Sequence, residues 1–499
     1  MSLLPKARPS ESRIRRSQLA LLRVSAALGP LLAVSSALMF GLVAEARPGF
    51  SAFRIFSKPS SLLPSVAPEK PEAAAKVGEA ELAANSGPSQ ITPRPDSPQP
   101  AGPTLFGGKP VAKELPRTDA PPVSLIGPQN LRAFYESLDL TRRASTEEPH
   151  VTRILHLGDS LIVSDYVSSS LRRLMQKEFG DAGHGFQLVA NAWPSYFHAD
   201  VQRSSSGGFR ASRISGPKTS DRLYGLGGVT FRGGSGLRAQ FGTVKGGEIG
   251  QNVSRFEVFY LQTPGGGDVS VLADGAELGR ISTAGPLLGA QRVFELSDGP
   301  HSFELVLKGA ESRLFGVVME RNVSGVVWDA LGVQGARLRT LSENDPAHFA
   351  AQLRARTPKL VAFQFGINES GDGYAVPMPE LTRGILEVLK QAREAVPEAS
   401  CLVIGAMDRA RLEDGQVVSM RVIPLIVRAQ REAAEAAGCA FFDTYAAMGG
   451  AGSMPRWVKR GLGNADMMHP SGVGADRIAT WIFRALMDGY RVERARASD

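Results

Sequence analysis

The chain has 499 residues, 43% of them hydrophobic, and a formal net charge of +8. This length is enough for a large hydrophobic core and for two domains beside segments that do not fold. The charge does not indicate nucleic-acid binding, because residues 1–23 hold six basic side chains against one acidic one and no recognisable nucleic-acid-binding motif follows.

Residues 24–43 form an uncharged, mostly apolar run that follows this basic tail. A run of about 20 residues is just long enough to cross a bilayer, and the preceding basic residues predict an amino terminus that stays in the cytoplasm. A cleaved signal peptide is the alternative, since Ala44-Glu45-Ala46 fits a cleavage site. The run is longer than a usual signal core, which favours a single-pass anchor. With either an anchor or a signal peptide, the chain after residue 46 is exported. We therefore expect a cell-envelope protein that is anchored in the inner membrane and faces the periplasm, or a secreted protein.

Residues 44–125 are rich in Pro, Ala, Ser and Glu and predict a disordered linker. Order is predicted to resume with an α/β domain whose first part covers residues 126–205. A helix over 130–142 precedes an apolar strand at 151–155, and a helix with one apolar face is expected from Ser160 to Phe179. Ser160 therefore lies where a buried strand ends and a helix begins.

Residues 206–325 have a different pattern, in which apolar and polar residues alternate in short runs between Gly-rich turns. Asp274-Gly275 and Asp298-Gly299 are typical of hairpin turns. No helical periodicity appears, so this segment is predicted to be an inserted β-sandwich. Tyr224 and Tyr260 are candidates for stacking on sugar rings there.

The α/β pattern returns over residues 326–490. Strands are expected at 328–333, 360–365, 402–404 and 440–442, and helices at 381–395, 422–437 and near 474–487. This alternation predicts a parallel sheet with helices on both faces. Cys401 and Cys439 each open one of the short strands. On neighbouring strands their thiols would lie at one sheet edge, where an exported protein could oxidise them; two buried free thiols are the alternative.

Residues suited to ester hydrolysis stand in the predicted loops and next to the last helix. Such a reaction needs an activated hydroxyl, a base held in one tautomer and donors for an oxyanion. Ser160 is the predicted nucleophile, His469 the base, and Asp466, three residues upstream, the group that orients it. The predicted oxyanion donors are the backbone N–H groups of Ser160 and Gly335 and the side-chain amide of Asn368.

Three further histidines are considered as candidates for the site. His156 is expected to pack in the core, whereas His184 and His198 lie in loops and are weaker candidates for lining the cleft. No cluster of His, Cys and Asp has the spacing of metal ligands, so neither a metal nor another cofactor is predicted.

Gly158-Asp159-Ser160, Gly335, Gly366-x-Asn368 and Asp466-x-x-His469 together resemble the four blocks of the SGNH (GDSL-type) hydrolase superfamily. The resemblance covers about residues 126–490 and implies a Ser-His-Asp triad on a parallel sheet. Three further features are similar to bacterial peptidoglycan O-acetylesterases: Gly-Asp-Ala-Gly-x-Gly-Phe at 180–186, Gly335-Ala336 after a long β insertion, and Glu369 after Asn368. In that family the insertion resembles a carbohydrate-binding sandwich.

The sequence thus predicts a membrane-tethered, exported serine esterase that removes O-acetyl groups from an envelope polysaccharide, with peptidoglycan as first candidate. A polysaccharide O-acetyltransferase with the same triad is one alternative, because both reactions share an acyl-enzyme. A non-catalytic glycan-binding protein is another, although the four intact blocks disfavour it. The insertion is expected to help present a long polymer to Ser160; a purely structural lid is the competing interpretation.

Overall fold

The computed structural model describes residues 122–498 of the chain. The basic tail, the predicted membrane or signal segment and the predicted linker up to residue 121 lie outside the described residues. Within residues 122–498, no helix is both long enough and apolar enough to span a bilayer.

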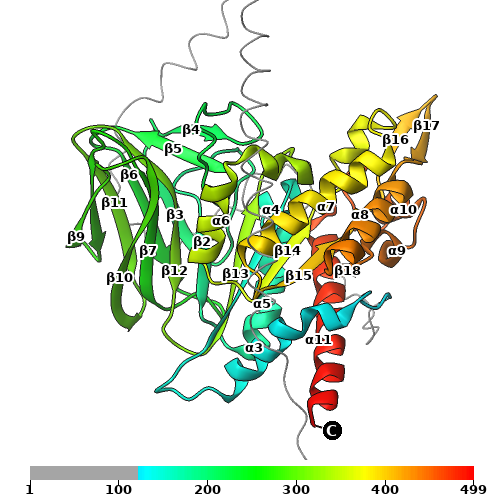
Figure 1. Cartoon of the computed structure of the whole chain (residues 1–499), viewed down its shortest axis with the longest axis horizontal. Helices are drawn as coiled ribbons and strands as arrows, with labels where there is room; N and C mark the ends of the chain where they lie inside the picture. The colour runs from blue at the N-terminus through cyan, green and yellow to red at the C-terminus, as the bar shows by residue number, and fades with distance from the viewer. Residues whose placement is uncertain (1–121, 499) are drawn as a thin grey trace, which may run out of the picture. The chain divides into compact units, whose positions relative to one another are not determined.

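A parallel sheet forms the centre of the α/β part (Figure 1). In the described chain its strands lie in the order β13 (Gly325–Gly332), β1 (Val151–Gly158), β14 (Leu360–Gln364), β15 (Ser400–Ile404) and β18 (Ala440–Phe442). Every neighbouring pair is parallel. Their carboxyl ends, and the loops that follow them, therefore share one edge of the sheet, which is where α/β folds bind ligands.

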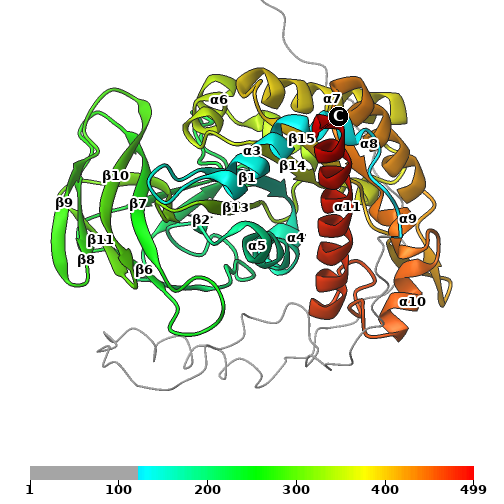
Figure 2. The same ribbon diagram turned by 90° about the horizontal axis from the view of Figure 1, so that it is seen from below.

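Helices cover both faces of this sheet, because successive side chains of each strand point to opposite faces. On β1, Ile154 packs into one core cluster, whereas Leu155 and Leu157 pack into the other. The first cluster lies under α3 (Arg132–Arg143), α5 (Tyr166–Phe179) and α11 (Gly472–Ser498), and the second under α6 (Pro346–Ala355), α7 (Met378–Ala395) and α8 (Ile423–Ala437). Figure 2 shows α6 and α7 on one side of the sheet and α5 on the other. The predicted α/β class with a parallel sheet is confirmed.

The chain segment between α5 and β13 forms two antiparallel sheets that pack face to face. One has the order β10 (Leu288–Gly299), β7 (Val253–Gln262), β12 (Ser312–Glu320), β5 (Val229–Gly233) and β4 (Arg210–Arg213), with β2 (Gly183–Gln187) also paired to β12. The other has the order β3 (Val201–Ser205), β6 (Arg238–Thr243), β11 (Ser302–Lys308), β8 (Asp268–Ala273) and β9 (Ala276–Ser282). The rings of Phe256 and Phe303 stack between the sheets with centroids 4.1 Å apart.

The antiparallel sheets differ from the expected insertion at its start. Strands β2 and β3 both precede residue 206, yet β2 pairs with β12 and β3 pairs with β6. The hydrogen bonds of these strands are therefore satisfied by the sandwich, and the expected boundary at residue 206 falls after its first strands.

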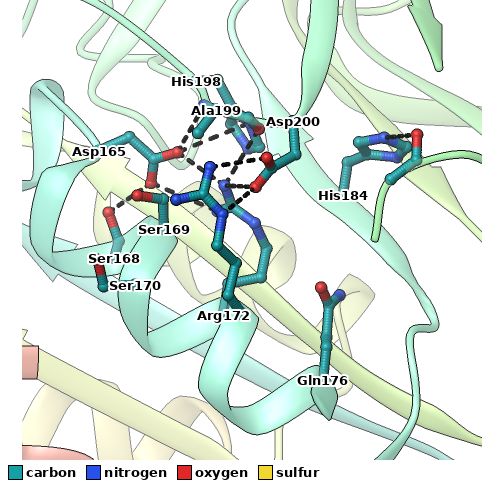
Figure 3. A network of polar contacts seen from close by, with 12 residues as sticks. Asp165, Ser168, Ser169, Ser170, Arg172, Gln176, His184, His198, Ala199 and Asp200 are labelled. Carbon is teal, nitrogen blue, oxygen red and sulfur yellow. Dashed lines mark hydrogen bonds and ion pairs between the residues drawn. The ribbon is translucent and has the colours of Figure 1, made fainter. Parts of the chain in front are cut away.

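The helix expected from Ser160 to Phe179 is broken into two. The four-residue helix α4 (Ser160–Val163) ends before Asp165, whose φ of 55° is left-handed, and α5 starts at Tyr166. The buried carboxylate of Asp165 accepts hydrogen bonds from Ser168 Oγ and Arg172 within α5 and from the backbone N–H of Ala199, as Figure 3 shows. These bonds stabilise the break, which periodicity alone did not predict.

Cys401 on β15 and Cys439 beside β18 are joined by a disulfide. The two thiols meet because β15 and β18 are neighbouring parallel strands in the same register, Leu402 facing Ala440. Of the two states left open by the sequence, the structure has the bonded one.

Candidate active site

Ser160 follows the end of β1 and is the first residue of α4. The preceding strand ends at Gly158, which pairs with Gln364 on β14 and Gly332 on β13. A Cβ atom at Gly158 would lie 2.3 Å from Ile162 Cγ1, so only glycine permits this tight passage from strand to helix. The turn delivers the Ser160 side chain to the carboxyl edge of the sheet.

Ser160, His469 and Asp466 form a continuous series of hydrogen bonds. Ser160 Oγ lies 2.8 Å from His469 Nε2, and His469 Nδ1 lies 2.7 Å from Asp466 Oδ2. With Nδ1 protonated and donating to the carboxylate, Nε2 is left to accept the hydroxyl proton of the serine. The structure thus brings together three side chains that are up to 309 residues apart in the chain.

The Asp466 carboxylate is held in its ionised form. Partial burial acts to raise its pKa, but hydrogen bonds from the His469 ring and from the backbone N–H groups of His469 and Met468 outweigh it and lower the pKa below the usual value. The same bonds orient the carboxylate toward the ring, so that one tautomer of His469 is favoured.

The predicted oxyanion donors converge on the loop that follows β13. Asn368 Nδ2 donates to the backbone carbonyl of Ala336 at 2.9 Å and lies 3.4 Å from Asp159 Oδ2, so Asn368 joins the Gly335 loop to the residue preceding the serine. Gly335 has a φ of 74° and open space around its Cα. Among residues 122–498, the backbone N–H groups of Ser160 and Gly335 donate to no acceptor, which leaves both available to a ligand oxygen.

Two buried carboxyl groups of this site were not assigned a role from the sequence. Asp159 is fully buried, accepts a hydrogen bond from the Leu161 N–H, and burial raises its pKa to about 7. Glu369 accepts from the backbone N–H of Leu338, and burial raises its pKa as well. Both residues stand inside the recognised blocks, so their positions were visible, but their burial depends on how β1, β13 and β14 are ordered.

His156 is a core residue, as expected. It is fully buried, packs edge-on against Trp328, accepts a hydrogen bond from that indole, and its pKa is lowered to about 4 by burial.

His184 and His198 are also buried, beside Arg172 and Asp200 (Figure 3). Burial lowers the pKa of His198 to about 3, so its ring is neutral at physiological pH. His184 lies on β2 rather than in a loop and is hydrogen-bonded to the Gly250 carbonyl, whereas His198 lies in the loop that leads from β2 to β3 and is hydrogen-bonded to the Ala199 carbonyl.

The loop that leads from β2 to β3 is fixed against α4, the short helix that begins at Ser160. The N–H of Phe197 donates to the carbonyl of Val163 at the end of α4, and Ser195 Oγ donates to Gln334 Oε1 beside Gly335. The Asp165–Arg172 pair holds Ala199 from both its N–H and its carbonyl. One wall of the site is therefore built by the segment that enters the sandwich.

The expectation that Tyr224 and Tyr260 stack on sugar rings is wrong. Tyr224 is 1% exposed and its hydroxyl accepts a hydrogen bond from the Thr219 N–H, while Tyr260 is 8% exposed. Tyr260 lies on β7, a strand bordered by β10 and β12, and its ring packs into the sandwich core.

Within the described residues, no group of three His, Cys, Asp or Glu side chains is arranged to hold a metal ion.

Comparisons with known proteins agree with this geometry. Residues 308–477 match the model of the GDSL-like lipase/acylhydrolase family. The matched segment contains Gly335, Asn368, Asp466 and His469; Ser160 lies outside it, beyond the sandwich, and is brought back by the parallel pairing of β1 with β13 and β14. No curated protein matches the chain in sequence.

Among solved structures, a peptidoglycan O-acetylesterase is similar, with a TM-score of 0.61 and 23% sequence identity over 72% of this chain and 96% of that one. A family two carbohydrate esterase from Cellvibrio japonicus reaches a TM-score of 0.24 at 12% identity, covering 58% of this chain and 98% of its own. The first similarity shows a common fold, whereas the second score is too low to support a conclusion.

The family match defines the class of the protein, a carboxylic ester hydrolase. More narrowly, residues 308–477 match the GDSL-like acylhydrolase family, the chain resembles the SGNH hydrolases, and its fold resembles that of a peptidoglycan O-acetylesterase, as the sequence motifs predict.

Proposed function

We propose that the protein is an exported serine esterase that removes O-acetyl groups from an envelope polysaccharide, with peptidoglycan as its substrate. The observation that carries this proposal is the series of contacts from Asp466 Oδ2 through the His469 ring to Ser160 Oγ. The fold shared with a peptidoglycan O-acetylesterase supports the choice of glycan.

In the proposed reaction, Ser160 Oγ attacks the acetyl carbonyl carbon while His469 Nε2 takes the hydroxyl proton. The carbonyl oxygen becomes an oxyanion, which the N–H groups of Ser160 and Gly335 and the Asn368 amide stabilise. The tetrahedral intermediate then collapses, and the sugar oxygen leaves with the proton from His469.

Water completes the cycle. His469 removes a proton from a water molecule that attacks the acetyl-serine, and acetate leaves as the proton returns to Ser160 Oγ. If a second sugar hydroxyl took the place of water, the same residues would transfer the acetyl group instead. The acceptor therefore decides between hydrolysis and the transferase alternative.

Export is proposed on two grounds. The basic tail and the apolar run at 24–43 have the pattern of a membrane anchor or a signal segment. The Cys401–Cys439 disulfide suits an oxidising compartment such as the periplasm, since cytosolic thiols are kept reduced. We therefore propose that the enzyme acts in the cell envelope, anchored to the inner membrane or secreted.

We also propose that the sandwich helps to present the polymer. A groove of about 610 Å³ runs along residues 190–209 and is lined by Asn191, Phe197, Arg203 and Phe209. Phe197 is the residue whose N–H is bonded to the end of α4, so the groove starts beside the nucleophile helix and continues along β3. Its exposed polar side chains suit a hydrated glycan better than the buried tyrosines do.

The test uses the full purified chain and O-acetylated peptidoglycan, with released acetate as the measured product. Wild-type protein should release acetate, and an added acceptor glycan should not divert acetyl groups onto it. Acetylation of the acceptor without release of acetate would replace the esterase by the transferase. Absence of both products, with intact activity on a small acetyl ester, would exclude this glycan.

A further inference from the structure

A short hairpin projects from the same sheet edge as the catalytic loops. It consists of β16 (Ala410–Glu413) and β17 (Gln416–Ser419), joined by a turn at Asp414-Gly415, and it follows β15 (Figure 1). Ser160 follows β1, which is two strands away from β15 in the sheet. Neighbouring strands are about 4.8 Å apart, so the hairpin begins roughly 10 Å from the strand that carries the nucleophile.

The base of this hairpin is fixed to two catalytic loops. The Ala410 N–H donates to the carbonyl of Met467, in the segment between Asp466 and His469. Arg409 Nη1 donates to the carbonyl of Ile367 at 3.2 Å and to Ser370 Oγ at 2.8 Å, on either side of Asn368. On the other strand, Ser419 Oγ donates to the buried Asp408 carboxylate. These bonds hold the hairpin in a defined position relative to His469 and Asn368.

The outer part of the hairpin, in contrast, exposes apolar side chains. Leu412 is 70% exposed and Val417 is 44% exposed. Tyr374, in the loop that follows Asn368 and Glu369, is 65% exposed. Between this loop and the hairpin lies a groove of about 390 Å³, lined by Tyr374, Met420, Arg411, Glu413 and Arg421. Arg411 is ion-paired with Glu413, so among the described residues that line the groove Arg421 is the cation that is left to a ligand. An exposed aromatic ring beside an exposed arginine suits a sugar ring with an acidic substituent.

The strand order places this groove on a line with the other features of the site. Along the sheet, the order is β13, β1, β14 and β15. At this edge, the loop that leads into the sandwich is bonded to the end of α4 through the Phe197 N–H, Ser160 follows β1, Asn368 follows β14, and the hairpin follows β15. A polymer that lies along this edge passes from the sandwich over Ser160 and reaches the hairpin, so the groove continues the substrate path beyond the reactive acetyl group.

We propose that the groove between the β16–β17 hairpin and the loop 373–377 is a subsite for the glycan chain, in which Tyr374 stacks on a sugar ring of the polymer next to the acetylated residue. This inference rests on the proposed function, since its occupant is the polymer that Ser160 deacetylates. The side chain of Tyr374 contacts the substrate but takes no part in bond breaking, so it acts on the affinity for long substrates.

The experiment compares two substrates on variants of the full chain. Tyr374→Ala should lower kcat/KM on O-acetylated peptidoglycan about fivefold to tenfold, mainly through KM, because one aromatic stacking contact is lost. Activity on 4-nitrophenyl acetate should not change, since that ester is too small to reach the groove. Tyr374→Trp should retain polymer activity. Leu288→Ala removes a similarly exposed apolar side chain, 59% exposed on β10, and should change neither activity.

A binding assay separates this inference from the proposed function. Ser160→Ala and the double variant Ser160→Ala/Tyr374→Ala are compared for retention on insoluble peptidoglycan, where no turnover occurs. Weaker retention of the double variant supports the subsite even if acetate release fails and the proposed function falls. Equal retention, an unchanged polymer KM for Tyr374→Ala, or an equal loss on both esters would overturn the subsite.

Discussion

Replacing Asn368 with Ala tests the proposed oxyanion site. The side chain makes one short hydrogen bond, from Nδ2 to the Ala336 carbonyl, and a longer contact to Asp159. Loss of one such bond costs about 1 kcal/mol of folding free energy. Loss of a preorganised oxyanion donor costs about 10²–10³ in kcat, which corresponds to about 2.7–4 kcal/mol of transition-state stabilisation. The expected result is a stable protein with a large kcat defect.

Steady-state hydrolysis of 4-nitrophenyl acetate measures this defect, with thermal unfolding recorded on the same samples. Asn130→Ala is the matched control, because Asn130 Nδ2 donates to the Cys439 carbonyl at 3.2 Å and lies at the opposite end of the strands. That variant should lose a similar amount of stability and no kcat. A change in KM alone for Asn368→Ala would refute the reasoning, because Asn368 would then bind the ground state and the transition state equally.

Two other predictions concern stability. Replacing Cys401 and Cys439 with Ala opens a loop of 38 residues and should lower the free energy of unfolding by about 4 kcal/mol, measured by urea denaturation; unchanged stability would contradict it. Burial raises the pKa of Asp159 to about 7, so the folded protein keeps a proton that the unfolded chain loses near pH 4. The contribution of Asp159 to the free energy of unfolding of the wild type should therefore fall as the pH rises from about 4 to 7. Asp159→Asn has no carboxyl group to ionise, so its stability relative to wild type should increase with pH across this window; a difference independent of pH would refute the raised pKa.

The grouping of the candidate catalytic residues was predictable because their signal is local. Gly158-Asp159-Ser160 stands directly between an apolar strand and a helix, and Asp466 and His469 are close enough in sequence to share a loop. Parallel strands place their carboxyl ends on one edge, so motifs that follow different strands are expected to meet. The structure places them in contact without any rearrangement of the predicted strands.

Features that depend on which surfaces cover each other were not predictable. The alternation around Tyr260 fits a strand with one face in water, yet eight of the ten residues of β7 are buried, since both of its faces are covered. The start of the sandwich was placed too late because β2 and β3 are short and pair with the distant strands β12 and β6.

The β16–β17 hairpin was missed although its turn was visible. Asp414-Gly415 is a typical hairpin signal, and both residues have positive φ values, 47° and 76°. Its flanking strands contain only four residues each, too few for a clear alternation. Its position beside His469 depends on bonds from Ala410 and Arg409, which no sequence pattern reveals.

The most direct test of the central claim is the rate of acetyl-ester hydrolysis by Ser160→Ala. Because Ser160 and His469 act as one unit, removing the hydroxyl should lower kcat/KM by several orders of magnitude. Asp466→Asn should cost less than Ser160→Ala. Circular dichroism should show an unchanged fold, since the serine hydroxyl is partly exposed at the sheet edge. Wild-type turnover by the folded Ser160→Ala protein would contradict the assignment of Ser160 as the nucleophile.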